Sequence, residues 1–393
     1  MLKIVFFCIP AHGHTNPTLG VVQELISRGH QVWYYSYNNM REKILATGAT
    51  FRSCDDYDLE QQLPQDVSAR IGKDLALSTQ ILVDTTLSMD DKLCDEMKRI
   101  MPDCIVADSM AVWGKAIALK LGIPFVSSTT TFAFNQYSAR IMKQSPAELL
   151  KMIISMPKIS KHIKRLQNKG YPIKSVLDII QNDACTHTIV YTSPEFQPCS
   201  DTFSDKYAFV GPSIRPAVDE IVKTRDTLIY ISMGTVNNDM LPLYKRFISA
   251  LEKLPYQVIL SVGNQVPIAA FGNLPEHISV FPQVDQIAVL QKADLFISHC
   301  GMNSVSESLF FGVPLIMLPQ TAEQKGVAAR VAQLHAGLNL IKTDAASIQK
   351  AITTLLSDPN YRKSATLISE GFMRCPGPKG AADKIQQICQ EPQ

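Results

Sequence analysis

Residues 294–312 read as a buried strand, a short turn and a helix in succession, and this stretch limits the possible folds more than any other. The strand, residues 294–298, is Asp-Leu-Phe-Ile-Ser, an apolar run typical of a strand covered on both faces. After a turn over residues 299–304, the sequence predicts a helix from Val305 to Phe311 that ends before Pro314. A buried strand that leads through a turn into a helix is the unit of a parallel α/β sheet.

The turn over residues 299–304 has groups that suit an anion. The start of a helix has unpaired backbone N–H groups and the positive end of the helix dipole. Gly301 allows a ligand to approach the backbone, Ser304 is expected to cap the helix, and His299 adds a donor. Glu307, one turn further on, can accept hydrogen bonds from hydroxyl groups. The turn therefore suits the phosphate and hydroxyl groups of a sugar nucleotide, and the alternative is an ordinary capped turn with a core histidine.

The same alternation of strand, turn and helix recurs in both halves of the chain. Lys3–Ile9 is an apolar run, Asn16 is expected to cap the next helix with Pro17 as its first residue, and a strand follows at Gln31–Tyr37. The first loop has no G-x-G-x-x-G, so a dinucleotide fingerprint is absent. In the second half the alternation restarts with a strand at Thr227–Ser232.

The chain of 393 residues is longer than a single hydrophobic core usually accommodates, so two domains are expected. The stretch Ile214–Asp226 is charged, contains proline and lacks a period, which favours a linker. A Pro/Gly break after Cys375 lets a final helix change direction. We therefore predict an α/β protein with two doubly wound, Rossmann-like domains. The expected segments are residues 1–213, a linker at 214–226, residues 227–375 and a C-terminal helix within 376–393.

Composition excludes several classes of protein. A net charge of +2 argues against nucleic acid as a partner. Nine cysteines without a C-x-x-C pair argue against a disulfide framework or a zinc site and favour the cytoplasm. The N-terminus lacks the features of a secretory signal, and no apolar run approaches the ~18 residues of a membrane span, so stable membrane insertion is not expected.

A histidine and a carboxylate are expected to meet in the first domain. His12 follows the first strand, and Asp108 ends a short apolar strand at residues 105–107. Because the carboxyl ends of parallel strands share one edge of the sheet, the two side chains can come together. A carboxylate that holds one imidazole nitrogen leaves the other to take a proton from a substrate. The alternatives are a loop histidine bonded to backbone and an aspartate that caps a helix.

Three loops are expected to meet at the corresponding edge of the second domain. They carry Gly234 and Thr235, the turn at 299–304, and Glu323 with Gln324. The last two side chains suit sugar hydroxyls, and the alternative is an acidic first helical turn that complements the helix dipole.

Two charged segments have plainer interpretations. Residues 140–175 carry nine Lys and Arg residues and one acid, Glu148. We interpret this segment as the solvated face of helices that cover a pocket. The alternative is peripheral contact with a membrane or an anionic acceptor. The acidic cluster Asp55–Asp58 is interpreted as a surface loop, not as a metal site.

Several stretches, in this order, resemble signatures of the inverting nucleotide-sugar glycosyltransferases of the bacterial macrolide and plant natural-product type. They cover nearly the whole chain: residues 11–17, 102–108, 209–213, 231–235, 299–304 with Glu307, 312–314, 319–320 and 323–324.

The resemblance implies the GT-B architecture, in which two Rossmann-like domains face each other across a cleft and the final helix crosses back to the first domain. It implies His12 as general base with Asp108 as its orienting partner. The implied donor-binding residues are Gly234, Thr235, His299, Gly301, Asn303 and Ser304 for the diphosphate, Glu307 for the ribose, Glu323 and Gln324 for the sugar, and Gln286 with the backbone of Val284 for the base. The expected acceptor-binding residues are Ser128, Thr130, Phe132, Phe134 and Tyr137, and core packing is the alternative for the aromatic ones.

The implied activity is metal-independent transfer of a hexose, by default from UDP-glucose, to a hydroxyl of a macrolide, flavonoid, sterol or lipid, with no cofactor. Gln283 stands where many relatives have a tryptophan that stacks on the base, and Asp285 where they often have proline. Thymidine and guanosine donors therefore stay open. The alternative functions are a non-hydrolysing sugar-nucleotide epimerase and a non-catalytic subunit that binds a nucleotide sugar.

Overall fold

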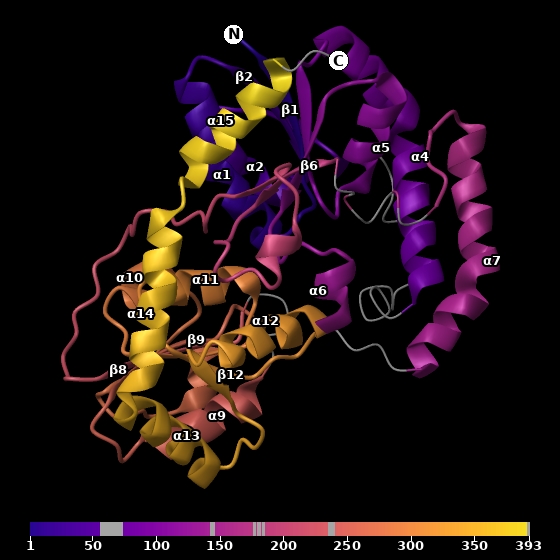
Figure 1. The fold of residues 1–393 in the computed structure, drawn as a ribbon. Helices are drawn as coiled ribbons and strands as arrows, with labels where there is room; N and C mark the ends of the chain where they lie inside the picture. Colours follow the sequence, from indigo (N-terminus) through magenta and orange to yellow (C-terminus); the bar gives the residue numbers. More distant parts are fainter. Residues whose placement is uncertain are drawn as a thin grey trace. The chain divides into compact units, whose positions relative to one another are not determined.

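The computed structural model describes residues 1–55, 74–141, 146–175, 178, 182, 185–234 and 240–390 (Figure 1). The chain forms two compact units. The first comprises Met1–Tyr191, Gln197–Ser213 and Pro376–Gln393, and the second comprises Thr192–Phe196 and Ile214–Cys375. The stretch expected as a linker, residues 214–226, and the short stretch 192–196 are thus part of the second unit.

The first unit contains a seven-stranded parallel sheet with the order β3-β2-β1-β4-β5-β6-β7. The chain reverses its direction across the sheet between β1 and β4, which is where doubly wound folds place their sites. The strands are β1 (Lys3–Phe7), β2 (Gln31–Ser36), β3 (Thr50–Ser53), β4 (Cys104–Asp108), β5 (Phe125–Thr129), β6 (His187–Val190) and β7 (Tyr207–Phe209). The helices are α1 (His12–Ser27), η1 (Asn38–Met40), α2 (Arg41–Leu45), α4 (Leu75–Ile100), α5 (Val112–Leu121), α6 (Gln136–Ile141), α7 (Pro146–Asn168), η4 (Ser200–Thr202) and α15 (Gly377–Gln390).

Strand β1 separates two hydrophobic cores of this unit. Ile4 and Phe6 belong to the core beneath α1 and α15, whereas Val5 and Phe7 belong to the core beneath α4 and α5. Alternate side chains of a strand point to opposite faces, so a continuous apolar run fills both cores.

Helix α1 begins earlier than the sequence indicated. We expected Asn16 as its cap, but the helix starts at His12, its N-cap is Ala11, and Pro17 lies inside it. The amides of His14 and Thr15 both donate to the carbonyl of Ala11, at 3.0 and 2.9 Å, so the helical turn has formed before Asn16. This early start places His14 within the first turn of a helix.

The C-terminal helix α15 packs against α1 within the first unit, and Figure 1 shows the yellow helix beside α1. Its buried face carries Ala381, Ile385 and Ile388, which join the core beneath α1. Arg28 at the end of α1 donates hydrogen bonds to Asp383 and Gln386. Apolar contacts and charged hydrogen bonds together hold this helix to the first unit.

The second unit contains a six-stranded parallel sheet with the order β10-β9-β8-β11-β12-β13, and its reversal lies between β8 and β11. The strands are β8 (Leu228–Ser232), β9 (Gln257–Ser261), β10 (Ile278–Phe281), β11 (Leu295–Ser298), β12 (Leu315–Met317) and β13 (Gly337–Asn339). The helices are α9 (Leu241–Leu251), η5 (Ile268–Phe271), α10 (Gln286–Leu290), α11 (Met302–Phe310), α12 (Ala322–Gln333), α13 (Ala345–Ser357) and α14 (Pro359–Arg374).

A buried carboxylate ties the stretch after Ser213 to this second unit. Asp285 caps α10 and also accepts hydrogen bonds from Arg215 and from the backbone N–H groups of Val218 at 2.6 Å and Asp219 at 3.1 Å. Burial opposes its ionisation, but these hydrogen bonds outweigh burial and hold the pKa of Asp285 well below its ordinary value.

The docking of α15 can be tested by truncating one buried side chain. Ile385 is fully buried, so Ile385→Ala should lower the free energy of unfolding of the first unit by about 2–5 kcal/mol. Denaturant unfolding measures this change, and the exposed Gln387→Ala on the same helix is the control. Equal stability of the two variants would mean that α15 is not docked.

The role of Asp285 predicts a pH dependence. Because its pKa is depressed in the folded protein, its stabilisation is complete above the unfolded-state pKa of about 3.9 and is lost as the pH falls through the folded-state value. Asp285→Asn should cost about 1–3 kcal/mol at pH 7, and its difference from the wild type should shrink below pH ~4. Thermal unfolding from pH 3 to 7 measures this, with the exposed Asp219→Asn as control. A constant difference across that range contradicts the prediction.

Candidate active site

A histidine–carboxylate pair lies at the carboxyl ends of β1 and β4. Asp108, whose side chain is fully buried, is 2.7 Å through Oδ2 from Nδ1 of His14. Its other oxygen accepts from the backbone N–H of Met110 at 2.8 Å, and the hydroxyl of Thr130 lies 3.2 Å from the same imidazole nitrogen. An Nδ1–H group that donates to a carboxylate leaves the basic lone pair of the ring on Nε2.

The partner of Asp108 is therefore His14, whereas the sequence predicted His12. His12 is exposed, and its Nδ1 lies 3.3 Å from the ammonium group of Lys43. Partial burial and the charge of Lys43 both lower the pKa of His12. Residues two apart on a helix point in different directions, so only one of the two histidines can reach Asp108. The sequence did not indicate that α1 starts at His12, because the Asn-Pro pair at residues 16–17 predicts a later helix start.

The expected acceptor-binding residues differ in their surroundings. Ser128 and Thr130 are buried, and Ser128 donates to the hydroxyl of Tyr191 at 3.3 Å. Phe132 is buried, in keeping with core packing, whereas Phe134 and Tyr137 are 41% and 45% exposed. Within this set, Thr130 contacts the His14–Asp108 pair directly.

The turn between β11 and α11 differs in detail from the expectation. Helix α11 begins at Met302, its N-cap is Gly301, and no side chain caps it, so Ser304 is a residue of the first turn instead of the cap. The imidazole of His299 fills the space between the two glycines of the site. A Cβ atom would lie 2.5 Å from its Nε2 at Gly234 and 2.8 Å from it at Gly301. Burial lowers the pKa of His299, which favours the neutral imidazole.

A hydrogen-bonded network joins α10 to α11. The side-chain amide of Gln286 donates to Glu307 and, at 3.3 Å, to Ser304, while its oxygen accepts from Tyr230 at 3.2 Å. Burial raises the pKa of Glu307, and the hydrogen bond from Gln286 and the charge of Arg215 oppose that rise. Three of the expected nucleotide-binding side chains thus contact one another, and the backbone of Val284 lies just before the cap of α10.

Glu323 and Gln324 occupy the first turn of α12 after β12. Gln324 forms a capping box with Thr321, and its side-chain oxygen accepts from the backbone N–H groups of Gln320 at 2.8 Å and Thr321 at 3.1 Å. Glu323 is exposed. Gln324 thus takes part in capping the helix, and Glu323 is an acid in its first turn, as the alternative interpretation predicted. Both residues follow β12 at the carboxyl edge of the sheet.

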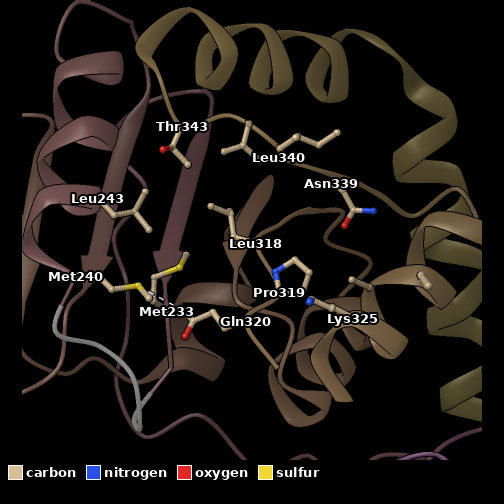
Figure 2. Close-up of a pocket in the computed structure, with 13 residues that line it drawn as sticks. Met233, Met240, Leu243, Leu318, Pro319, Gln320, Lys325, Asn339, Leu340 and Thr343 are labelled. Carbon is tan, nitrogen blue, oxygen red and sulfur yellow. Dashed lines mark hydrogen bonds between the residues drawn. The ribbon is translucent and has the colours of Figure 1, made fainter. Parts of the chain in front are cut away.

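A largely apolar pocket of about 650 Å³ lies at the carboxyl ends of β8, β12 and β13, between α9 and α12 (Figure 2). One polar contact crosses it, from the side-chain amide of Gln320 to the sulfur of Met240 at 3.5 Å. The pocket is lined by Met233, Met240, Leu243, Leu318, Pro319, Gln320, Lys325, Ala328, Ala329, Asn339, Leu340, Ile341 and Thr343.

Several features predicted from the sequence lie partly outside the described residues. These are Thr235, most of the acidic cluster at 55–58, and the side chains of residues 139–153. In the described part of α7, Lys158, Lys161 and Lys164 are exposed, while Ile159 and Ile163 pack into a core with α4 and α5 residues. None of the helices in the described ranges is long and apolar enough to cross a membrane.

Comparison with known proteins gives consistent matches. Residues 245–388 match the family described as the C-terminal domain of erythromycin biosynthesis protein CIII-like proteins. The NDP-glycosyltransferase YjiC of Bacillus licheniformis is 31% identical, over 98% of this chain and 96% of the relative. The uncharacterized UDP-glucosyltransferase YojK of Bacillus subtilis is 28% identical, over 100% of this chain and 98% of the relative.

Among solved structures, the glycosyltransferase of kitacinnamycin superimposes with a TM-score of 0.85 at 24% identity and covers 98% of both chains, which shows a shared fold. Both units have the parallel α/β sheets of that fold. The chain therefore belongs to the YjiC-type glycosyltransferases, and its fold is that of the GT-B enzymes.

Proposed function

We propose that this enzyme transfers a hexose from a nucleoside diphosphate sugar to a hydroxyl of an apolar small molecule, with inversion at the anomeric carbon. The observation that carries the proposal is the His14–Asp108 pair at the carboxyl edge of the first sheet. The similarity to the NDP-glycosyltransferase YjiC and to YojK supports a nucleoside diphosphate donor, and the name of YojK supports UDP-glucose. Macrolides, flavonoids, sterols and lipids are the proposed acceptors.

In this proposal, His14 is the general base. Asp108 holds the Nδ1–H group, so that Nε2 takes the proton of the acceptor hydroxyl while its oxygen attacks the anomeric carbon. The nucleoside diphosphate departs from the opposite face of the sugar. The buried carboxylate of Asp108 then stabilises the imidazolium ion that forms. Thr130 contacts the same nitrogen of His14 and helps to orient the ring.

The second unit supplies the proposed donor site. The backbone N–H groups at the start of α11, with Gly301, Asn303 and Ser304, bind the diphosphate, and the neutral imidazole of His299 donates one further hydrogen bond. These groups stabilise the negative charge of the leaving group in place of a metal ion. Glu307 accepts from the ribose hydroxyls and Gln286 binds near the base. Glu323, Gln324, Gly234 and Thr235 complete the site around the sugar and the phosphates.

The two histidines of the first turn of α1 can be distinguished by substitution. His14→Ala should reduce turnover by about 10²–10⁴-fold, because a positioned general base contributes that factor, and should leave the affinity for UDP unchanged. His12→Ala is the matched control and should retain most activity. Transfer from UDP-glucose to a phenolic acceptor, followed by chromatography, measures turnover, and calorimetry measures UDP binding. Loss of activity in His12→Ala alone would reverse the assignment.

The proposed donor site also predicts independence from divalent cations. Since backbone and side-chain donors neutralise the diphosphate, turnover should be the same with excess EDTA as with added magnesium. The control is a magnesium-dependent kinase measured in the same buffers, and EDTA must abolish its activity. Activity that disappears with the chelator and returns with manganese or magnesium contradicts this part of the mechanism.

A further inference from the structure

Arg215 presents a planar cation in a fixed orientation. Its Nη2 donates to the carboxylate of Asp285, and its Nη1 donates to the carbonyl of Pro216 at 3.0 Å. Two hydrogen bonds from different nitrogens determine the plane of a guanidinium group. The side chain nevertheless remains 51% exposed. A guanidinium that is oriented on one side and open on the other can receive a flat ligand.

The position of Arg215 relates it to the nucleotide network. Asp285 directly precedes Gln286, whose side-chain amide donates to Glu307 and Ser304. The charge of Arg215 also acts on the carboxylate of Glu307. The guanidinium therefore lies near the residues to which the proposed function assigns the ribose and the base.

The loop between β10 and α10, residues 282–285, contains no aromatic side chain that could stack on a base. Position 283, which lies between β10 and α10, is a glutamine. The nearest aromatic residue in that loop, Phe281, ends β10 and is 42% exposed. Guanidinium groups stack on nucleobases by combining a flat surface with a cation–π interaction. Arg215 offers that surface here.

We propose that Arg215 stacks on the base of the nucleoside diphosphate sugar and that Asp285 is the positioning residue that orients it. This inference deepens the proposed function and rests on it. Asp285 acts twice, because it aligns the guanidinium and also caps α10 immediately before Gln286. A proline at position 285 has no carboxylate, so it could not accept hydrogen bonds from Arg215 or from the backbone N–H groups of residues 218 and 219.

The affinities of uridine and UDP for Arg215 variants test the stacking. Arg215→Ala should weaken both ligands about 10-fold, since stacking on a base contributes a factor of that order. Arg215→Lys retains the charge without the plane and should weaken both ligands to a similar extent. The matched control is Arg225→Ala, an exposed arginine of the same stretch. Calorimetry measures each dissociation constant.

A double-variant comparison tests the role of Asp285. Asparagine still caps a helix, so Asp285→Asn should keep α10, while loss of the negative charge weakens the interaction that holds Arg215 in place. We expect Asp285→Asn to weaken UDP about as much as Arg215→Ala does, and the double variant to be no weaker than either single one. The KM for the donor should rise while kcat at saturating donor is retained. Additive losses in the double variant would mean that Asp285 does not act through Arg215.

Other outcomes overturn the inference separately from the proposed function. If Arg215→Lys binds UDP like the wild type, the arginine acts as a charge toward the phosphates and does not stack. If Phe281→Ala weakens uridine and Arg215→Ala does not, the base lies on Phe281. If the wild type binds UDP and all Arg215 variants bind it equally, only this inference fails. If the wild type binds no nucleoside diphosphate, the proposed function itself fails.

Discussion

The parallel pairing of β1 with β4 is the constraint on which the first half of the site depends. Its register aligns Phe7 with Ala107, so the residues that follow these two strands emerge at one edge of the sheet. Helix α1 follows β1, and Asp108 is the last residue of β4. His14 therefore lies 2.7 Å from the carboxylate of Asp108, although the two residues are 94 positions apart in the sequence. Burial of Asp108 makes this contact matter, because a buried carboxylate needs hydrogen-bond partners.

The second unit uses the same arrangement for a different purpose. The reversal of its sheet between β8 and β11 brings Gly234 beside His299, and the lack of Cβ atoms at Gly234 and Gly301 makes room for the imidazole. Glycine is also required at position 234 by its φ of +84°. The unit thus combines a helix N-terminus, a neutral histidine and the Gln286–Glu307 network within one sheet edge. These are groups that bind phosphate and hydroxyl groups without a large net charge.

Much of this could be predicted from local sequence. The apolar run 3–9 and the strand 294–298 appear in the structure as β1 and β11, because a strand buried on both faces has a clear pattern. The predicted start of α1 was wrong by five residues, since Asn-Pro is a strong local signal for a helix start and the carbonyl of Ala11 already accepts two helical hydrogen bonds. Because of that error, His12 was predicted as the partner of Asp108 in place of His14. Asp285 was noticed only as a departure from the family, since its partners Arg215, Val218 and Asp219 lie about 70 positions away.

The sequence by itself determined the α/β class, the alternation of strands and helices, and the residue types present at each strand end. These follow from local periodicity, and local periodicity is a property of neighbouring residues. Only the tertiary structure decided which of two histidines meets Asp108, which residue caps α11, and that a carboxylate at position 285 orients Arg215. Such choices depend on the direction of a side chain from its helix and on distant backbone groups, and a difference of a few residues in a helix start changes them.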